Sequence, residues 1–450
     1  MKKSIYFIGI GGIGVSALAR YYLENGYQVF GSDLTASEIT DSLQKIGAEV
    51  FIINSKFKIQ NSKLKFNIQN LIKKDQFVIY SPAVPKNHPD LKLAKKLKIK
   101  CQSYPQALGE LTKKYFTIAV AGTHGKSTTT SMLGLLLTKA GFDPTVIVGT
   151  KLKEFGDSNC RVGKSKYLVI EADEHFASFL NYWPKIIVLT TIEADHLDYY
   201  KNLRNIINSF KKFVSHLPKD GILIANKDDK NIYNTFSTAV KNVLWYSLKD
   251  RESERLRKNL RVPGEHNLSN ALAVLKVAQF LKIPAKIAFK ALSEYRGAWR
   301  RFEEKILKIG NWKLKIIADY AHHPTEVEVT LKAAREKYPN KKIWCLFQPH
   351  QYQRTFYLFK DFIRVFKEIL EKKWVDKLFI TDIYDVPGRE NEEIKKKVNS
   401  QKLVKNVNRE GIMYLPKNEI LNYLKKNISG KEIIIIMGAG DIYSLTKIIK

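Results

Sequence analysis

The segment from Thr117 to Thr130 is the sequence feature that most constrains the fold. It reads TIAVAGTHGKSTTT: an apolar, β-prone run, a glycine turn, and a Gly-Lys-Ser that leads into a helix-compatible run over 131–139. Small residues in such a turn let backbone N–H groups point at phosphate oxygens, and the positive end of the following helix attracts them. Lys126 is then expected to reach the outer phosphates and the Ser127 hydroxyl to bind Mg²⁺. The segment therefore predicts a nucleotide-phosphate loop between a strand and a helix.

The spacing of this loop departs from the usual phosphate-loop pattern. Val120 stands five residues before Gly125, where the pattern has a glycine, and Gly122 makes a tighter loop. A lone Gly-Lys-Ser is often only a turn that enters a helix. The preceding strand and the four successive hydroxyl residues after the lysine favour the phosphate interpretation.

A second glycine-rich turn lies near the N-terminus. A strand expected over 4–8 leads to GIGGIG at 9–14, a helix over 15–25 and a strand over 28–30, shortly before Asp33. This is the start of a βαβ unit with an acidic residue about 20 positions after the glycines. Three interpretations remain open on the residues alone. They are a dinucleotide with Asp33 on a ribose, the diphosphate of another nucleotide such as a UDP-sugar, and a turn that only packs strand against helix.

Acidic and imidazole side chains follow two further expected strands. Glu171 begins EADE after the strand over 167–170, and His196 lies in IEADHLD after the strand over 186–190. In a doubly wound sheet, ligands bind at the edge formed by the carboxyl ends of the strands. A carboxylate, an imidazole and Ser127 around a nucleotide triphosphate make a reasonable Mg²⁺ shell. The alternative is that these side chains are solvated loop acids and helix caps.

The last third of the chain repeats strand, polar turn and helix four times. We expect strands over 315–318, 343–347, 377–381 and 433–437, followed by DYAHHPTE, FQPHQYQRT, DIYD and GAGD. This repetition predicts another α/β sheet, and four polar clusters at one edge favour the lining of a site. Upstream, VPGEHNLSNA precedes a helix expected over 268–281. Its Asn267 and Asn270 are candidates either to cap that helix or to read a base.

Composition limits the possible partners. The 450 residues carry a formal net charge of +32, three widely separated cysteines and no apolar run long enough to cross a membrane. Lysine is spread along the chain without aromatic interleaving, so we expect a solvated surface and no nucleic-acid partner. Cysteines without metal spacing suit a reducing compartment, so we expect a cytoplasmic protein that does not insert into membranes. Residues 54–74 are interpreted as a low-complexity surface insertion.

Together, the ordered motifs resemble the Mur ligases of bacterial cell-wall synthesis. The resemblance runs over nearly the whole chain and rests on GIGGIG, GSD, AGTHGKSTTT, EADE, IEADHLD, VPGEHNLSNA and DYAHHPTE, with GAWRRFE and FQPHQYQRT besides. It implies an α/β fold of three domains. These are an N-terminal Rossmann-like UDP-sugar domain over 1–105, a central P-loop ATPase-like domain over 106–296, and a C-terminal Rossmann-like α/β domain over 297–450 for the amino acid and ATP.

The resemblance also implies a role for each of several residues. Those implied for the UDP-sugar are Gly9, Gly11, Gly12, Gly14 and Asp33. Those implied for ATP are Gly122, Thr123, His124, Gly125, Lys126, Ser127, Thr128, Asn270, Arg301 and Asp319. Those implied for the metal are Ser127, Glu171 and His196. Those implied for the amino acid are Tyr320, His322, His350 and Arg354, and those for catalysis are Lys126, His196 and Arg301.

The reaction implied by the resemblance is a ligation that uses ATP and Mg²⁺. The lactyl carboxylate of UDP-N-acetylmuramate would attack the γ-phosphate, and the amine of L-alanine would attack the acyl phosphate so formed. His196 or another imidazole is expected to accept the amine proton. The motifs FQPHQYQRT and EADEHFASF favour the alanine-adding branch over the branch that joins a recycled tripeptide. The phosphate loop disfavours a nicotinamide dehydrogenase, and a nucleic-acid binder would rest on charge alone.

Two departures from the family pattern concern the substrates. Gln351 stands where the pattern FQPHRYTRT has an arginine, which removes one expected contact to the amino-acid carboxylate. Ile53 and Asn54 stand where the family has Gly-His, next to the expected insertion, so the uridine pocket is expected to differ. The sequence does not indicate an oligomeric state.

Overall fold

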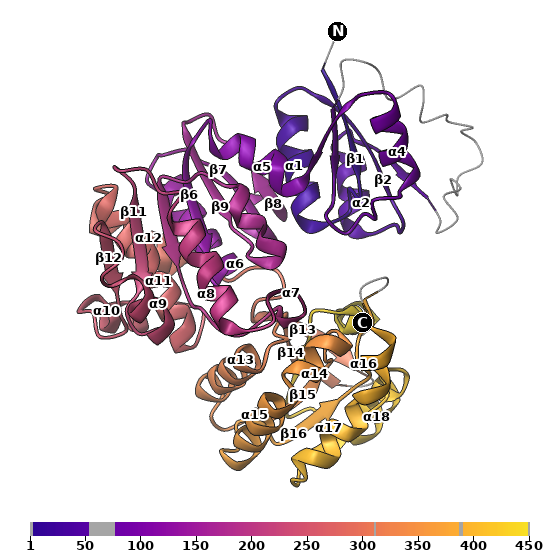
Figure 1. Ribbon diagram of the computed structural model, residues 1–450. Coiled ribbons are helices and arrows are strands. Elements are labelled where there is room, and N and C mark those ends of the chain that lie inside the picture. The colour runs from indigo at the N-terminus through magenta and orange to yellow at the C-terminus, as the bar shows by residue number, and fades with distance from the viewer. Residues whose placement is uncertain (1–2, 54–76, 310–311, 387–389, 449–450) are drawn as a thin grey trace.

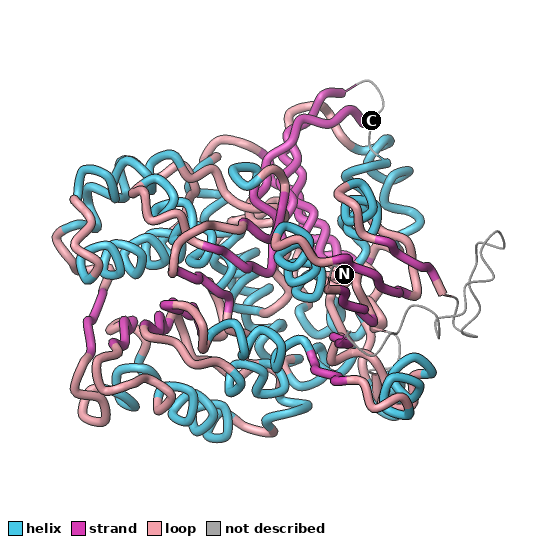
Figure 2. The backbone as a smooth tube through the Cα atoms, turned by 90° about the horizontal axis from the view of Figure 1, so that it is seen from above, coloured by secondary structure: helices cyan, strands magenta, loops and turns pink. Residues whose placement is uncertain are grey.

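The computed structural model describes residues 3–53, 77–309, 312–386 and 390–448 (Figure 1). These residues form three α/β units, each built on its own sheet (Figures 1 and 2). The insertion expected over 54–74 lies outside the described residues. The domain boundaries expected at 105/106 and 296/297 remain predictions.

The N-terminal unit is a parallel five-stranded sheet in the order β3-β2-β1-β4-β5. The strand order reverses between β1 and β4, where an open α/β sheet binds ligands, and the glycine turn follows β1. The expected βαβ start is confirmed, with the second strand extended to Asp33. The elements are β1 (Ser4–Ile8), α1 (Ile13–Glu24), β2 (Gln28–Asp33), α2 (Glu38–Lys45), β3 (Glu49–Ile52), β4 (Phe77–Tyr80), α4 (Pro89–Lys96), β5 (Lys100–Ser103) and α5 (Tyr104–Thr112).

The central unit is a seven-stranded sheet in the order β12-β11-β10-β6-β9-β7-β8, in which only β8 runs antiparallel to its neighbour. Its strands are β6 (Phe116–Ala121), β7 (Thr145–Leu152), β8 (Ser158–Arg161), β9 (Tyr167–Glu171), β10 (Ile186–Leu189), β11 (Ile222–Asn226) and β12 (Val243–Tyr246). Its helices are α6 (Lys126–Lys139), α7 (Leu197–Tyr200), α8 (Leu203–Val214), α9 (Lys230–Phe236), α10 (Glu252–Asn259), α11 (Glu265–Phe280) and α12 (Ala285–Glu294), with a 3₁₀ segment η2 (His175–Asn181).

Strand β6, which carries the phosphate loop, lies in the middle of this sheet and is buried on both faces. Successive side chains of a strand point to opposite faces. Accordingly, Ala119 and Ala121 belong to one apolar cluster, whereas Ile118 and Val120 belong to the cluster on the other face. This explains why the strand before the loop is a continuous apolar run.

The C-terminal unit is a six-stranded sheet in the order β13-β14-β18-β15-β16-β17. The four expected strands are confirmed as β14, β15, β16 and β18. Strand β13, which was not expected, pairs antiparallel with β14, and its alternating exposure is typical of an edge strand. The elements are β13 (Glu303–Ile309), β14 (Trp312–Asp319), α13 (Pro324–Lys337), β15 (Lys342–Phe347), α14 (Tyr352–Tyr357), α15 (Phe359–Glu371), β16 (Lys377–Ile380), α16 (Glu392–Lys397), α17 (Ser400–Val407), β17 (Ile412–Tyr414), α18 (Ile420–Asn427), β18 (Glu432–Met437) and α19 (Leu445–Ile448).

The N-terminal and central units share one continuous apolar core. Buried side chains of α1 and α5, including Leu18 and Leu108, belong to the same cluster as Leu168 of β9 and Phe179 of η2. A polar contact fixes the same interface, because Asn159 of β8 accepts from Arg20 Nε at 3.1 Å and donates to the carbonyl of Ile13 at 2.5 Å.

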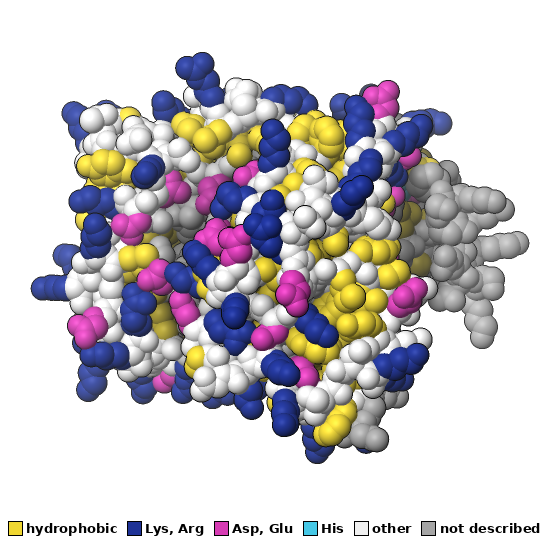
Figure 3. Space-filling model, turned by 90° about the horizontal axis from the view of Figure 1, so that it is seen from below, with side chains coloured by type: hydrophobic (Ala, Val, Ile, Leu, Met, Phe, Trp, Pro, Cys, Tyr) yellow, Lys and Arg dark blue, Asp and Glu magenta, His cyan; other side chains and the backbone are white. Residues whose placement is uncertain are grey.

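The surface is charged, and no helix that the structure describes is suited to cross a membrane. On the face drawn in Figure 3, Lys and Arg side chains are interspersed with Asp and Glu. None of the helices in the described ranges combines the length and the apolar character that a transmembrane span requires.

Gly109 tests the interface between α5 and the central unit. A β-carbon at this position would overlap the backbone carbonyl oxygen of Asn181 in η2. We expect Gly109→Ala to destabilise the protein by about 1–3 kcal/mol, because backbone atoms cannot move aside as a flexible side chain can. The measurement is the urea midpoint of unfolding. The control is Glu110→Ala on the exposed face of the same helix, and an equal, small effect of both changes would contradict the close packing.

Candidate active site

Two neighbouring cavities lie beyond the carboxyl ends of the strands in the three units. The larger, about 610 Å³, is lined by residues that follow β1, β6, β9, β14, β15 and β18, and so by all three units. The smaller, about 180 Å³, lies between the central and C-terminal units. Arg301 and Glu326 line both cavities, so the two are adjacent.

The phosphate loop is tighter than the usual pattern because it is held against the end of β10. Gly122 has φ 140°, and a β-carbon there would overlap the Thr190 hydroxyl. Thr123 N donates to Thr191 O at 2.8 Å, and His124 N donates to the Thr191 hydroxyl at 3.0 Å. Helix α6 begins directly after the loop at Lys126, five residues earlier than the run first expected from the sequence.

Lys126 is a buried cation at the centre of the larger cavity. Its ammonium donates to the carbonyl oxygens of Gly122 at 2.7 Å and Thr123 at 3.1 Å, and lies 2.8 Å from Glu174 Oε2. Burial opposes its charge, but Glu174 and the neighbouring acids outweigh this and raise the pKa of Lys126. Burial raises the pKa of the Glu174 carboxyl to about 7, although Lys126 opposes that shift. The lysine therefore keeps its charge and pairs with an acid in the cavity.

The three residues predicted for the metal all line the larger cavity, but they form two groups. Ser127 Oγ donates to Glu171 Oε1 at 2.9 Å, while Gly149 N donates to the other oxygen of the same carboxylate at 2.7 Å. The His196 ring instead has Glu174 as its neighbour, with Nε2 3.8 Å from Oε1. Ser127 and Glu171 thus offer hard oxygen ligands side by side, which suits Mg²⁺.

His196 is a neutral imidazole in this structure. Burial, helped by His175 and Arg354, lowers its pKa to about 3 even though Asp195 opposes the shift. Its ring stacks on that of His175, with the ring centroids 4.1 Å apart. The neutral ring has a free nitrogen lone pair, which either a metal ion or a proton can take.

The smaller cavity collects most of the remaining residues predicted for ATP. Gly125 packs tightly against Asn270, and Asp319 accepts from the backbone N–H groups of Phe302 at 2.7 Å and Ala321 at 2.8 Å. Burial raises the pKa of Asp319. The predicted residues in its lining are His124, Gly125, Thr128, Asn270, Arg301 and Asp319; Thr123, Lys126 and Ser127 line the larger cavity.

The cap predicted for the helix after VPGEHNLSNA was wrong. Gly264 is the N-cap of α11, without a side-chain hydrogen bond, and the helix starts at Glu265. Asn267 therefore lies within the first turn, where its amide donates to the carbonyl of Pro263 at 2.6 Å. A glycine occupies the N-cap position because φ is 92° there, a backbone conformation that disfavours residues with a side chain.

The residues predicted for the UDP-sugar divide into cavity lining and loop support. Gly12 and Gly14 line the larger cavity, whereas Gly9, Gly11 and Asp33 are not among its lining residues. The Asp33 carboxylate accepts from the N–H groups of Gly11 and Leu34, both at 2.8 Å. In this structure Asp33 therefore holds the glycine turn in shape.

The four residues predicted for the amino acid lie together on the C-terminal wall of the larger cavity. Arg354 donates to Asp195 Oδ1 at 3.1 Å, and its Nη1 lies 3.1 Å from His350 Nδ1. Burial, followed by neighbouring cations, lowers the pKa of His350 to about 2, and burial lowers that of His322 to about 4. Both rings are therefore neutral near pH 7, and Tyr320 contacts the His322 ring edge-on.

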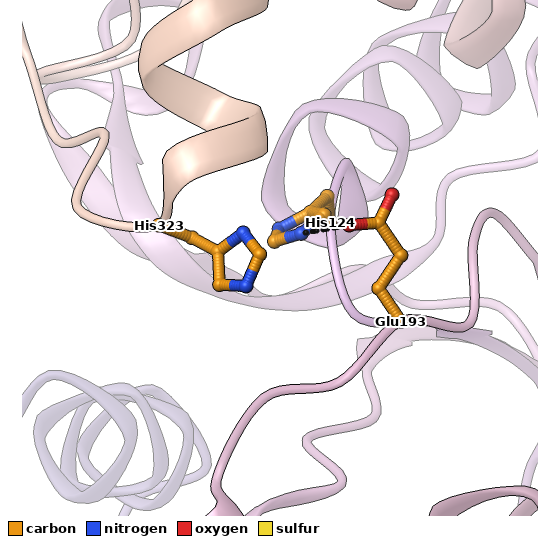
Figure 4. Close-up of side chains that lie close together, drawn as sticks. All are labelled: His124, Glu193 and His323. Carbon is orange, nitrogen blue, oxygen red and sulfur yellow. Dashed lines mark ion pairs between the residues drawn. The ribbon is translucent and has the colours of Figure 1, made fainter. Parts of the chain in front are cut away.

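His124 joins the phosphate loop to the C-terminal unit. Its Nδ1 lies 3.3 Å from Glu326 Oε1, and its Nε2 lies 3.5 Å from Glu193 Oε2. The His323 ring lies beside it, with the ring centroids 4.6 Å apart. Figure 4 shows His124 with Glu193 and His323. Burial opposes protonation, but Glu193 and Glu326 raise the pKa of His124 to about 10. In its protonated form His124 therefore makes an ionic contact between the units through Glu326.

Several lining residues were not singled out from the sequence. Glu174 and Glu326 lie inside EADE and HHPTE, so their motifs held the signal, but their partners Lys126 and His124 are distant in the chain. Tyr104, whose ring packs on Gly14, follows β5 without any motif. His266, which lines the smaller cavity, has a pKa lowered by burial to about 4.

Comparison with known proteins gives matches along the chain. Residues 4–116 match the family model described as "Mur ligase family, catalytic domain". Residues 120–259 match "Mur ligase middle domain", and residues 300–440 match "Mur ligase, glutamate ligase domain".

Individual relatives match over nearly their whole length. The UDP-N-acetylmuramate–L-alanine ligase of Acetivibrio thermocellus is 40% identical, with 98% of this chain and 94% of the relative covered. The enzyme of the same name from Clostridium acetobutylicum is 38% identical, with 99% and 97% covered. The crystal structure of UDP-N-acetylmuramate–alanine ligase from Thermotoga maritima is 26% identical, with 99% and 98% covered and a TM-score of 0.77.

The His124 contact predicts a pH-dependent stability. The pKa of about 10 in the folded protein exceeds the value of about 6.5 for an unfolded histidine. The stabilisation is therefore complete below pH 6.5 and is lost as the pH rises through about 10. We expect His124→Gln to lower the free energy of unfolding, measured by urea titration, more at pH 6.5 than at pH 9.5, with a difference of at least about 1 kcal/mol between the two pH values. His216→Gln, outside the site, serves as control, and a pH-independent effect of His124→Gln would contradict the ionic contact.

Proposed function

The chain belongs to the Mur ligase family, and on that basis we propose that it joins L-alanine to UDP-N-acetylmuramate while ATP is cleaved to ADP and phosphate. The chain is accordingly a ligase of peptidoglycan synthesis. The relatives named for this reaction cover nearly the whole chain. The observation that carries the proposal is the larger cavity. The glycine turn, the phosphate loop and the four residues predicted for the amino acid all line this one space.

The two cavities suggest an arrangement of the substrates. We propose the smaller cavity for the adenosine of ATP, with Asn270 and Asp319 on its wall, and the larger cavity for the phosphates and both other substrates. The diphosphate of the UDP-sugar would lie at Gly12 and Gly14, with Gly9, Gly11 and Asp33 supporting the turn. This arrangement directs the lactyl carboxylate from the N-terminal unit toward Lys126.

A divalent cation fits the residues beside the phosphate loop. Ser127 and Glu171 already share a hydrogen bond between hard oxygen donors, and neutral His196 is available on the other side of Glu174. We propose that Mg²⁺ is held by Ser127 and Glu171, with His196 as a further ligand. Such an ion neutralises charge on the phosphates of ATP.

The proposed reaction proceeds in two steps. An oxygen of the lactyl carboxylate attacks the γ-phosphorus of ATP, the bond to the β-phosphate oxygen breaks, and ADP and an acyl phosphate form. The neutral amine of L-alanine then attacks the acyl carbon, and the tetrahedral intermediate collapses as the carbon–oxygen bond to phosphate breaks. The nitrogen gives up a proton, which the departing phosphate takes, so that the amide and hydrogen phosphate form. Phosphoryl transfer depends on positioning and charge neutralisation, which Lys126 and Arg301 would supply, with His124 and Thr128 fixing the loop.

Two alternative functions, a tripeptide ligase and a nicotinamide dehydrogenase, are less well supported. A tripeptide ligase acting on the same UDP-sugar would use the same cavities, but the relatives from Acetivibrio thermocellus and Clostridium acetobutylicum are L-alanine ligases, which favours L-alanine. A nicotinamide dehydrogenase would leave the phosphate loop without a role. We also propose a cytoplasmic location, since the three cysteines are unpaired and ATP and a UDP-sugar are the substrates.

The test of the function is phosphate release by the purified protein. With UDP-N-acetylmuramate, ATP and Mg²⁺, release is expected only after an amino acid is added, and L-alanine should be the best of a panel of amino acids and the tripeptide. Background release with every acceptor would disprove the ligase, and a preference for the tripeptide would favour the alternative. No absorbance change with nicotinamide cofactors is expected.

Lys126 supplies a second test. We expect Lys126→Ala to reduce turnover at least 100-fold, because the cation that neutralises the transferred phosphate is lost. Binding of UDP-N-acetylmuramate, measured by calorimetry, should stay within about threefold, since this substrate is proposed to bind at the glycine turn of another unit. Loss of both would indicate misfolding. Lys139→Ala, at the far end of the same helix, is the matched control.

A further inference from the structure

Arg300 is a buried cation on the wall of the larger cavity, and its guanidinium pairs with no carboxylate of the described residues. It is 7% exposed, and its Nη2 donates to the carbonyl oxygens of Gly438 and Gly440. Its Nε is buried without a hydrogen-bond partner among the described residues. Since a buried ion is costly unless it is paired, this arrangement is suited to an anionic ligand.

The other cations around the cavity are compensated. Arg354 pairs with Asp195, Lys126 with Glu174, and Arg301 with Glu326 at 3.8 Å. Glu303, which accepts from the backbone N–H of Arg300 at 3.2 Å, pairs instead with Lys305 at 3.2 Å. Within the described ranges, the Arg300 guanidinium itself forms no ion pair with any of these acids.

Aromatic rings fix the position of this guanidinium. Its central carbon lies 4.7 Å from the ring centroid of Tyr320, 4.8 Å from that of Tyr443 and 5.6 Å from that of Trp299. The backbone at Arg300 is left-handed, with φ 57°, and its carbonyl accepts from Tyr320 N at 2.7 Å. The ring contacts are favourable, but the left-handed backbone costs free energy, and such strain is retained where the surrounding structure holds the residue for a site.

We propose that Arg300 binds the α-carboxylate of the incoming amino acid. This inference rests on the ligase function proposed above. Arg300 packs on Tyr320 and lines the same wall as His350 and Gln351. His322 and His350 are neutral, Gln351 carries no charge and Arg354 is compensated, so Arg300 provides the uncompensated positive charge on this wall.

The phosphates of ATP are a less suitable partner for Arg300. The residue does not line the smaller cavity, unlike its neighbour Arg301, which lines both. Its anchors, the carbonyls of Gly438 and Gly440 after β18, belong to the C-terminal unit, whereas the phosphate loop belongs to the central unit. A planar guanidinium held at this wall is matched in geometry to a carboxylate.

The test compares L-alanine with L-alaninamide, which keeps the amine and loses the negative charge. We expect Arg300→Met to raise KM for L-alanine about 10- to 100-fold, the loss typical of one charged hydrogen-bonded pair, while KM for ATP and the UDP-sugar stays within about twofold. The preference in kcat/KM for L-alanine over its amide should fall by the same factor. If turnover of L-alaninamide is too slow to measure, its inhibition constant against L-alanine is compared between the variants in place of kcat/KM. Arg300→Lys, which keeps the charge, should retain part of the preference.

Controls separate this proposal from a structural role and from the function itself. Arg296→Met, an exposed arginine four residues earlier, should behave as wild type. If Arg300→Met lowers kcat and the melting temperature while the preference for L-alanine is unchanged, Arg300 only supports the Gly438–Gly440 turn and the proposal is wrong. If the wild-type protein releases no phosphate with L-alanine, the ligase function fails first.

Discussion

Compensation of buried positive charge is the constraint on which the rest of this site depends. Lys126 must be buried to face a nucleotide, yet a lone ammonium in such a place is strongly disfavoured. The structure meets this cost with two loop carbonyls and with Glu174 from the segment after β9. A polyphosphate that replaces these groups must stabilise the Lys126 ammonium at least as strongly as they do. The loop is therefore selective for ligands with a high density of negative charge.

The same rule explains how residues from different units come to share one wall. His124 is paired across the junction with Glu326, and Arg354 of the C-terminal unit with Asp195 of the central unit. Each of these two pairs places one charge on each unit, so part of the charge compensation crosses the junction. Arg300 is the exception among these cations, and it is also the one whose position is fixed by rings and carbonyls in place of an acid.

Much of the fold could be predicted because the strands of parallel sheets are continuous apolar runs followed by polar turns. β1, β9, β10 and β18 were recognised in this way, and the placement of functional side chains after them followed from the topology. β13 could not be predicted, since a half-exposed edge strand has no such run. In the site, the pairing of His196 with Glu174 and the N-cap at Gly264 depend on backbone geometry and on contacts between residues far apart in the chain, which local patterns do not encode.

The two junctions between units differ in chemistry, and this difference decides what each can transmit. The N-terminal and central units share an apolar core, whose stability changes little with pH or salt. The contacts of the C-terminal unit with the central unit are mainly polar: the His124 pair, the Arg354 pair and the hydrogen bond of the Thr150 hydroxyl to the carbonyl of Trp299 at 2.9 Å. Because charge pairs respond to protonation and to salt, the junction beside the phosphate loop is the more sensitive of the two to pH and ionic strength. The part of the wall that carries His350 and Arg354 is tied to the central unit through Asp195, whereas Arg300 is fixed by rings and carbonyls of its own unit.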